Sequence, residues 1–414
     1  MEVRIKPIHI KLKALKNDVV SAETQFGKVD VPMSNFAFIT QGLAYQQRPF
    51  KVTASPKLTE AFYNSLNSQV CLSHLARDIS PFLSNYLTNK CSSNISTYES
   101  FFEHLKPTKR ILFCGAGPSL YESWEFVEWC LKTGYATVIA GGSAIKAFEL
   151  QGLIPDICLA CDPHPAVLNR GCVSEEFAKS TVLLAGSGVY PEFLTAWPGP
   201  KVLTNGMSAL PMGKYFEPTK EMLSEGGIGV STFSMGLASA LPDVEELFLL
   251  GVDLCPTSDK QVYPDHLGFK TEIDPSREHL WTCEANYLGL LAKKTSYRVI
   301  NLSIKGRQIP GSTKVPTNRV LDWELKPINR VLPTLTGYNR EEFISKCVFF
   351  SSELINLDLN DITRSPVYKA FIEIYHNVYL SRTLYTGEYS REPMLLKIEC
   401  LKSFLRELLE SIKR

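Results

Sequence analysis

The feature that most constrains the fold is a series of short apolar segments between residues 106 and 310. Each is followed by glycine or a small polar residue, as where ILFC precedes Gly115, TVIA precedes Gly141 and VLLA precedes Gly186. Stretches of helical periodicity, such as PSLYESWEFVEWCLKTG, separate these segments. Strands that alternate with short helices indicate βαβ units. The sequence therefore predicts an α/β fold with a doubly wound, mainly parallel, Rossmann-like core.

The flanking sequences differ in character from this core. The N-terminal stretch MEVRIKPIHIKLKAL alternates apolar and basic residues like a strand, and helical periodicity follows it. Beyond a proline-punctuated stretch, two C-terminal segments show helical spacing that suits packing on the core or on another subunit. We expect an N-terminal α+β region at 1–105, the Rossmann-like domain at 106–310 and a C-terminal helical region at 311–414, whose helices could join two copies of the chain.

Charge and cysteine content limit the class of protein and its location. The 44 basic and 43 acidic residues balance, which predicts no global attraction to nucleic acid. The 11 cysteines are odd in number and irregularly spaced, as expected for reduced thiols in the cytoplasm. Cys158 and Cys161 form a CxxC, but the stretch DICLACD reads as a buried strand, so we predict no metal there. No apolar stretch approaches the length of a membrane span.

The turn GAGPSL follows the first apolar strand of the core. Gly115 and Gly117 would let backbone N–H groups approach an anion, and Ser119 adds a hydroxyl at a helix start. Leu120 stands where a G-x-G-x-x-G dinucleotide motif needs its third glycine. The turn therefore predicts contact with a phosphate-bearing ligand other than a dinucleotide, or a tight strand-to-helix turn that binds nothing.

A second glycine-rich stretch, GGIGVSTFSMGLASAL, repeats this pattern later in the core. Gly227, Ser231 and Thr232 stand at the start of its helix and could hold the other side of a nucleotide. The alternative interpretation is a loop with an ordinary helix cap. Two such loops in one α/β domain favour a nucleotide site.

Acids and histidines at strand or loop ends supply candidate chemistry. Asp162 and Asp253 each end an apolar strand and could bond sugar hydroxyls, bind a metal through water or cap a turn. Among the histidines of the core, His164, His266 and His279 are candidate proton carriers, and proximity to the expected cleft favours the last two. The sequence contains no G-x-S-x-G, H-E-x-x-H or Walker A motif.

Four motifs in the same order carry a family resemblance. GAGPSL, AGGSAIKAFELQGLIPDICLACDP, LFLLGVDL and VINLSIKGRQIPGS resemble the bacterial motility-accessory-factor (Maf) glycosyltransferases. That family shares a domain with hydroxymethylpterin diphosphokinases, and its core is similar to the sialyltransferase fold. The resemblance implies transfer of a nonulosonic (sialic-acid-like) sugar from a CMP donor to an acceptor hydroxyl, such as a protein Ser or Thr or a glycan.

The resemblance also implies roles for individual residues. His279 would be the base, Tyr263 would lie near the leaving phosphate, and Cys255 stands where such sialyltransferases have another tyrosine. His266 stays a candidate catalytic residue from its position alone. The predicted donor-binding residues are Gly115, Gly117, Ser119, Gly142, Ser143, Asp162, Gly227, Ser231, Thr232 and Asp253.

Two alternatives stay open at this point. A 6-hydroxymethylpterin diphosphokinase would use ATP and magnesium on the same glycine-rich turn, with Asp162 and Asp253 near the metal. A nucleotide-binding or scaffold protein without activity is the other, motivated by the missing tyrosine at Cys255. The transferase needs no resident cofactor, and magnesium belongs only to the diphosphokinase.

Overall fold

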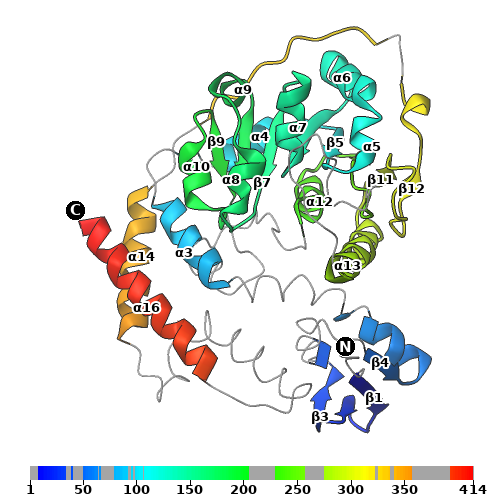
Figure 1. Cartoon of the computed structure of the whole chain (residues 1–414), viewed down its shortest axis with the longest axis vertical. Coiled ribbons are helices and arrows are strands. Elements are labelled where there is room, and N and C mark those ends of the chain that lie inside the picture. Colours follow the sequence, from blue (N-terminus) through cyan, green and yellow to red (C-terminus); the bar gives the residue numbers. More distant parts are fainter. Residues whose placement is uncertain are drawn as a thin grey trace, which may run out of the picture. The chain divides into compact units, whose positions relative to one another are not determined.

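The structure is a computed structural model of the chain (Figure 1). It divides into two compact units, one of residues 1–80 and 348–414 and one of residues 81–347. The residues that it describes are 8–33, 39–40, 50–63, 65–66, 79–91, 95–96, 98–105, 107–204, 229–256, 275–321, 325–335, 340–356 and 392–413.

The second unit contains an eight-stranded sheet in the order β12-β11-β10-β5-β6-β7-β8-β9. Every neighbouring pair in it is parallel. Its strands are β5 (Arg110–Cys114), β6 (Thr137–Gly141), β7 (Ile157–Ala160), β8 (Val182–Ala185), β9 (Lys201–Leu203), β10 (Glu246–Leu250), β11 (Arg298–Asn301) and β12 (Thr313–Lys314). The prediction of a doubly wound, mainly parallel α/β core is confirmed.

Apolar side chains in each strand point alternately to the two faces of this sheet, and both faces are covered by packed side chains. In β5, Leu112 and Cys114 pack in one cluster with Phe126 and Phe148, whereas Phe113 packs in another with helix residues such as Phe233. The described helices that pack in this unit include α3 (Ile79–Lys90), α4 (Tyr98–Leu105), α5 (Pro118–Tyr121), α6 (Trp124–Thr133), α7 (Ala144–Gln151), α8 (Ala166–Gly171), α9 (Glu175–Lys179), α10 (Pro191–Ala196), α12 (Val230–Ala240) and α13 (Pro275–Ala292). The core is a three-layer sandwich (Figure 1).

The first unit contains a smaller sheet in the order β3-β2-β1-β4. Its strands are β1 (Ile8–Ala14), β2 (Val19–Thr24), β3 (Gly27–Pro32) and β4 (Phe50–Thr53). β2 pairs antiparallel with β1 and β3, and β4 pairs parallel with β1. Ile8, Ile10 and Leu12 alternate with exposed residues in β1 and are buried. The alternation seen in the sequence therefore does form a strand.

The C-terminal part contains the helices α14 (Arg340–Ile355) and α16 (Glu392–Lys413), and the short 3-10 helix η3 (Thr317–Arg319) precedes them. The division into units differs from the predicted boundaries after residues 105 and 310. α4, most of α3 and residues 311–347 group with the large sheet, whereas residues 348–414 group with the N-terminal sheet. The three predicted regions stay a prediction.

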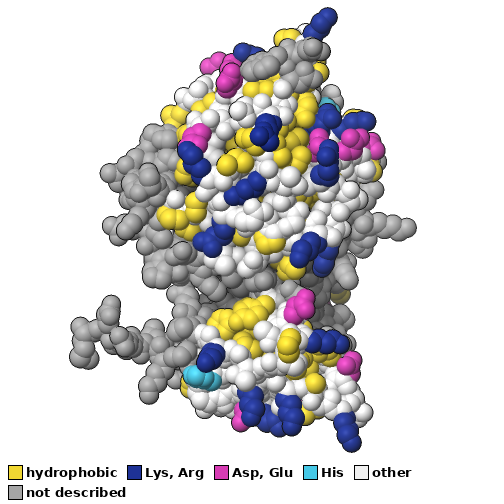
Figure 2. Space-filling view, turned by 90° about the vertical axis from the view of Figure 1, so that its right-hand side faces the viewer, with side chains coloured by type: hydrophobic (Ala, Val, Ile, Leu, Met, Phe, Trp, Pro, Cys, Tyr) yellow, Lys and Arg dark blue, Asp and Glu magenta, His cyan; other side chains and the backbone are white. Residues whose placement is uncertain are grey.

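The surface of the described residues mixes charge types. On the face shown in Figure 2, Lys and Arg side chains are dispersed between acidic, hydrophobic and uncharged ones. Among the helices that the structure describes, none combines the length and hydrophobicity that crossing a membrane would need.

Candidate functional site

The strand order places a topological switch point between β5 and β10. From β5 the chain builds the sheet outward through β6, β7, β8 and β9, and it then returns to add β10, β11 and β12 on the other side. In open α/β sheets, ligands bind outside the carboxyl ends of the strands at such a point. Most of the described residues predicted to bind the donor come directly after β5, β6, β7 and β10, at this carboxyl edge.

Gly115 and Gly117 bring the β5 turn against the β10 turn. The Gly115 N–H donates to Leu250 O at 2.8 Å, and the Gly117 N–H donates to Gly251 O at 2.9 Å. A Cβ on Gly117 would lie 2.2 Å from Asp253 Oδ2, and one on Gly115 would lie 2.5 Å from Gly251 O. These two amides are therefore engaged within the protein, and the structure explains both glycines by close approach of the two turns.

Ser119 and Asp253 form the centre of a buried polar network at the switch point. Asp253 Oδ2 accepts from the Ser119 N–H at 3.1 Å and lies 2.9 Å from Ser119 Oγ. Ser119 Oγ also lies 2.8 Å from Ser303 Oγ and accepts from the Gly251 N–H at 3.0 Å. A hydroxyl has one proton, so Ser119 donates to either Asp253 or Ser303 at a given moment. The structure thus brings two predicted site residues together.

The surroundings of the Asp253 carboxyl disfavour its charged form. It is 3% exposed, and burial raises its pKa, as does the charge of Glu122, although the two hydrogen bonds from Ser119 lower it. The next residue, Leu254, has a φ of 50°, which is a strained conformation for a bulky side chain. Perturbed carboxyls and strained backbone occur together at functional sites more often than elsewhere.

Ser303 and Asn301 extend the network and were missed as site residues by the sequence reasoning. Ser303 Oγ accepts from the Val252 N–H at 3.2 Å, and the Ser303 N–H donates to Asn301 Oδ1 at 2.9 Å. Asn301 is fully buried, and its Nδ2 has no hydrogen-bond partner among the residues that the structure describes. The available signal was the position of polar residues directly after the apolar strand in VINLS.

Gly142 and Ser143 form the turn after β6. Gly142 has a φ of 57°, which favours glycine, and its N–H donates to Leu159 O at 2.8 Å. Ser143 precedes α7 and is 7% exposed, and its hydroxyl makes no capping hydrogen bond to the start of this helix. Val230, the first residue of α12, packs beside this turn, with its Cγ2 3.6 Å from where a Cβ on Gly142 would lie.

The start of α12 is bonded to α13. The Ser231 hydroxyl donates to Glu284 Oε1, and the Thr232 hydroxyl donates to Gly229 O at 2.6 Å. Gly229 allows the carboxylate to come close, since a Cβ there would lie 3.2 Å from Glu284 Oε1. Both predicted hydroxyls are thus engaged within the protein, and the carboxylate of Glu284 lies at this helix start.

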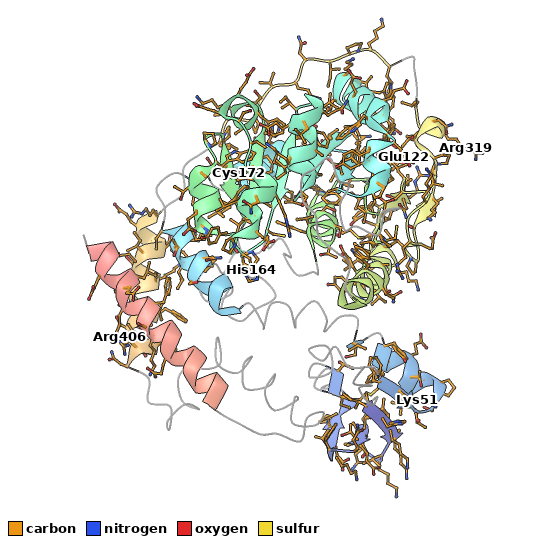
Figure 3. The ribbon with its side chains drawn as sticks, in the orientation of Figure 1. Lys51, Glu122, His164, Cys172, Arg319 and Arg406 are labelled. Atoms are coloured by element: carbon orange, nitrogen blue, oxygen red, sulfur yellow. The ribbon has the colours of Figure 1, made fainter. Side chains whose placement is uncertain are left out.

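Asp162 is placed at the carboxyl end of β7. Its Oδ1 accepts from the His164 N–H at 3.0 Å, and its Oδ2 lies 3.7 Å from Arg170 Nη1. Figure 3 shows His164 at this edge of the sheet, near α3. The structure therefore gives Asp162 a turn-capping role and an ion pair.

Helix α3 holds the β7 and β8 turns at the same edge. The Asn85 side-chain amide donates to Pro163 O at 2.9 Å and to Gly188 O at 3.1 Å. One turn later, Asn89 donates to Ser187 O at 3.1 Å and to Val189 O at 2.7 Å. These asparagines stabilise the turns at the carboxyl edge of the sheet, and nothing in their local sequence indicates this role.

Several predicted residues cannot be placed. Gly227, Tyr263 and His266 lie outside the described residues, and His279 lies in α13 without a described side chain. Within the described part of the chain, no three His, Cys, Asp or Glu side chains are close enough together to hold a metal ion. Cys158 is fully buried in β7, as the sequence predicts.

A cavity of about 370 Å³ lies at the opposite, amino edge of the sheet. Its walls come from α4, the starts of β6, β7 and β8 and the segment 328–333, and it shares no residue with the predicted site. Thr108 and Thr137, whose hydroxyls are 3.3 Å apart, are among its polar residues. We place the candidate site at the carboxyl edge, where the polar network and the switch point coincide.

Comparison with known families supports the resemblance inferred from the sequence. Residues 82–259 match the family model "6-hydroxymethylpterin diphosphokinase MptE-like". The match covers all of the chain from α4 to the β10 turn and includes the β5, β6 and β7 turns. The resemblance to this group of proteins is therefore confirmed over that segment. Among curated proteins, none matches this chain.

Two solved structures are similar at low identity. The Maf glycosyltransferase from Magnetospirillum magneticum AMB-1 is 16% identical with a TM-score of 0.48, over 92% of this chain and 66% of its own length. The sialyltransferase CstII from Campylobacter jejuni, in complex with a substrate analogue, CMP-3FNeuAc, is 14% identical with a TM-score of 0.27, over 58% of this chain and 99% of its own. This chain thus spans 66% of the length of the Maf protein.

Proposed function

We propose that this protein is a transferase that moves a nonulosonic sugar from a CMP-activated donor to an acceptor hydroxyl. The observation that carries the proposal is the buried polar group of Ser119, Asp253 and Ser303 at the switch point. Polar groups that converge at the carboxyl edge of such a sheet suit a polar ligand. The family match over the same turns adds support.

The site would promote this reaction mainly by electrostatic stabilisation of the charge that develops on the phosphate. The acceptor oxygen attacks the anomeric carbon while the bond from that carbon to the phosphate oxygen breaks, and CMP leaves with the electron pair. Ser143 stands at the start of α7, where a hydroxyl and a helix N-terminus would both stabilise charge on the departing phosphate. His279 is our proposed base for the acceptor proton, and Tyr263 and His266 stay candidates beside it.

Asp253 acts in this proposal as a positioning residue. Its carboxylate orients Ser119 and ties the β5 turn to the β10 turn, so the floor of the site is rigid. Arg307 supports the same segment, since its N–H donates to Asp253 O at 2.7 Å and its Nε donates to Leu254 O at 3.1 Å. A rigid floor keeps fixed dipoles aimed at the reacting phosphate.

A diphosphokinase is the second candidate, because the description of the matching family names that activity. It would move a diphosphate from ATP to a hydroxyl with magnesium bound. Asp162 and Asp253 would be its carboxylate ligands, but three of their four oxygens already face N–H or O–H donors or a guanidinium. As placed, these carboxylates do not fit a magnesium site, which favours the CMP-dependent transferase.

A ligand panel on the full chain separates these functions. Melting temperatures are measured with CMP, CDP, AMP and ATP, each with and without magnesium. A ligand at 100 times its Kd adds about 2.7 kcal/mol to the free energy of unfolding, which is readily measured. We expect CMP to stabilise the protein without metal. Stabilisation by ATP only with magnesium would instead support the diphosphokinase, and no response to any nucleotide would contradict both.

Turnover then tests the transferase itself. Release of CMP from a CMP-activated nine-carbon acidic sugar is followed with peptide and glycan acceptors. We expect His279→Ala to bind CMP like the wild type and to lower kcat by about 10²- to 10⁴-fold. Full turnover in that variant would remove His279 from the mechanism, and nucleotide binding without any turnover would favour a non-catalytic protein.

A further inference from the structure

Two cysteines meet where α3 packs against α14. The Tyr86 ring on α3 lies edge-on to the Phe343 ring on α14, with ring centres 5.6 Å apart and an 81° angle between the planes. Arg340 Nε donates to Cys91 O at 2.6 Å, directly after the end of α3. Cys347 lies one helical turn beyond Phe343. The two helices are thus joined by a ring contact and by a hydrogen bond to the backbone of Cys91.

The thiols of Cys91 and Cys347 are in hydrogen-bond contact with each other. Cys347 is fully buried, whereas Cys91 is half-buried and so reachable by a small oxidant. A disulfide needs its two sulfur atoms at about 2.05 Å, so the two thiols must move together from hydrogen-bond contact to form one. The sequence predicted reduced thiols and did not reveal this pairing.

We propose that Cys91 and Cys347 form a redox modification site that a hydroperoxide converts to a disulfide. The Cys91 sulfur first attacks one oxygen of the peroxide, which gives a sulfenic acid and one water. The Cys347 thiol then attacks the sulfenic sulfur, which forms the disulfide and releases the second water. The two thiols are oxidised by two electrons, and the hydroperoxide is reduced by two.

The surroundings set the speed of this reaction. The neighbouring Cys347 thiol and burial raise the pKa of Cys91, whereas the charge of Arg340 lowers it. The thiolate is the reactive form, so oxidation is slow at neutral pH and faster at higher pH. Arg340 and Cys347 are the charged or titratable groups that face Cys91 from α14 in the described structure.

The disulfide would reach the candidate site through α3. That helix holds the β7 and β8 turns through Asn85 and Asn89, which lie within two turns of Cys91. A bond from Cys91 to Cys347 would fix the end of α3 to α14 and would close almost the whole second unit into one covalent loop. The inference does not depend on the proposed transferase activity, because it concerns only these thiols.

Peptide mapping of the full chain tests the proposal. Trypsin cleaves after Lys90 and Lys346, so the two peptides of interest begin with Cys91 and Cys347. The reduced protein is treated with hydrogen peroxide at pH 7.0 and 8.5, its remaining thiols are alkylated, and linked peptides are identified by mass spectrometry. We expect the linked pair at both pH values, with faster formation at pH 8.5. We also expect the melting temperature to rise by roughly 5 °C on oxidation.

Variants separate this pair from general thiol oxidation. Cys347→Ala should abolish both the linked peptide and the rise in melting temperature, whereas Cys172→Ser, which removes an exposed thiol elsewhere, should keep both. Alkylated Cys91 or a Cys91 sulfinic acid in place of the linked peptide, at both pH values in the wild type, would overturn the proposal. If Cys347→Ala folds poorly, the peptide map of the wild-type protein still tests the proposal.

Discussion

The two edges of the large sheet differ in the partners that they give to buried charged groups. At the amino edge, buried and half-buried charges have partners: Glu246 joins Arg110 and Arg298, and Arg330 pairs with Asp156. At the carboxyl edge, Asp253 is buried with neutral donors, and its pKa is raised.

The carboxyl edge also holds strain and an unpartnered polar group. Leu254 is in a left-handed conformation, and Asn301 Nδ2 has no hydrogen-bond partner among the described residues. Features of this kind lower stability and persist where function needs them. The comparison indicates that the amino edge holds the fold together, and it is consistent with our placement of the candidate site at the carboxyl edge. The four predictions below are ordered by their expected effect on stability.

Replacing Arg330 tests the amino edge and should have the largest effect. Its Nε donates to Leu131 O at 2.6 Å, its Nη2 donates to Cys130 O at 2.8 Å, and its Nη1 forms the ion pair with Asp156. Arg330→Met leaves the carboxylate and the last carbonyls of α6 without this partner. We expect a loss of about 3 kcal/mol in the free energy of unfolding, measured with urea.

The matched control for this change is the exposed ion pair of Lys305 with Glu122. Lys305→Met should alter stability by less than about 0.5 kcal/mol, since exposed pairs contribute little. Nucleotide binding should survive in Arg330→Met at temperatures where the variant is folded. Equal stability of the two variants would contradict the assignment of the amino edge as the stabilising one.

Adding one methyl group at Gly117 tests the contact between the β5 and β10 turns. The new Cβ would lie 2.2 Å from Asp253 Oδ2 and 2.7 Å from Gly251 O, so the turns must separate. We expect Gly117→Ala to lose about 2 kcal/mol of stability and all measurable turnover. Gly27→Ala is the control, because nothing lies within 4 Å of its new Cβ. Retained turnover in Gly117→Ala would show that the site tolerates movement of its floor.

Asp253→Asn tests whether the buried carboxyl costs stability. Its folded-state pKa is raised, so its contribution to stability is fully present below the unfolded-state pKa and is lost as pH rises through the folded-state pKa. An amide can still accept from Ser119 and has no such loss. We therefore expect the variant to become more stable relative to the wild type as pH rises above the ordinary pKa of an Asp carboxyl, and to turn over substrate more slowly. A stability difference that stays constant with pH, measured by thermal unfolding, would refute a raised pKa.

Ser143→Ala should have the smallest effect on stability. Its hydroxyl makes no capping hydrogen bond to α7, so the melting temperature should stay within about 1 °C of the wild type. Affinity for CMP should fall roughly 5- to 10-fold, as expected for one lost hydrogen bond. Ser174→Ala is the opposite case, since Ser174 caps α9 by accepting from the Phe177 N–H. That variant should lose about 1 kcal/mol of stability and keep its affinity for CMP.

The periodicity of the sequence predicted the sheet because each strand is a short apolar run with its own ending. The same local signal located Gly115, Ser119, Ser143 and Asp253 at the carboxyl edge. It could not reveal which hydrogen bonds these residues make, because their partners come from other strands. The Gly115 and Gly117 amides, expected to face a phosphate, bond instead to the β10 turn more than a hundred residues away.

Hydrogen bonds between residues far apart in the chain also could not be predicted from the sequence. Asn85 is 78 residues from Pro163, and Arg330 is 200 residues from Cys130. Neither stands in a motif, and side chains of these types are common on solvated surfaces. Only the folded chain shows that one holds the β7 turn and the other completes the end of α6.

The strand order has a consequence for how the protein is made. β5 lies at the centre of the sheet, yet Glu246 of β10 follows Arg110 of β5 by 136 residues. At a synthesis rate of 5–20 residues per second, the edge of β5 that pairs with β10 therefore stays unpaired for about 7 to 30 s. During that time an apolar strand edge is open to pairing with another nascent chain. The protein should depend on chaperones in this interval, although its finished sheet buries that edge completely.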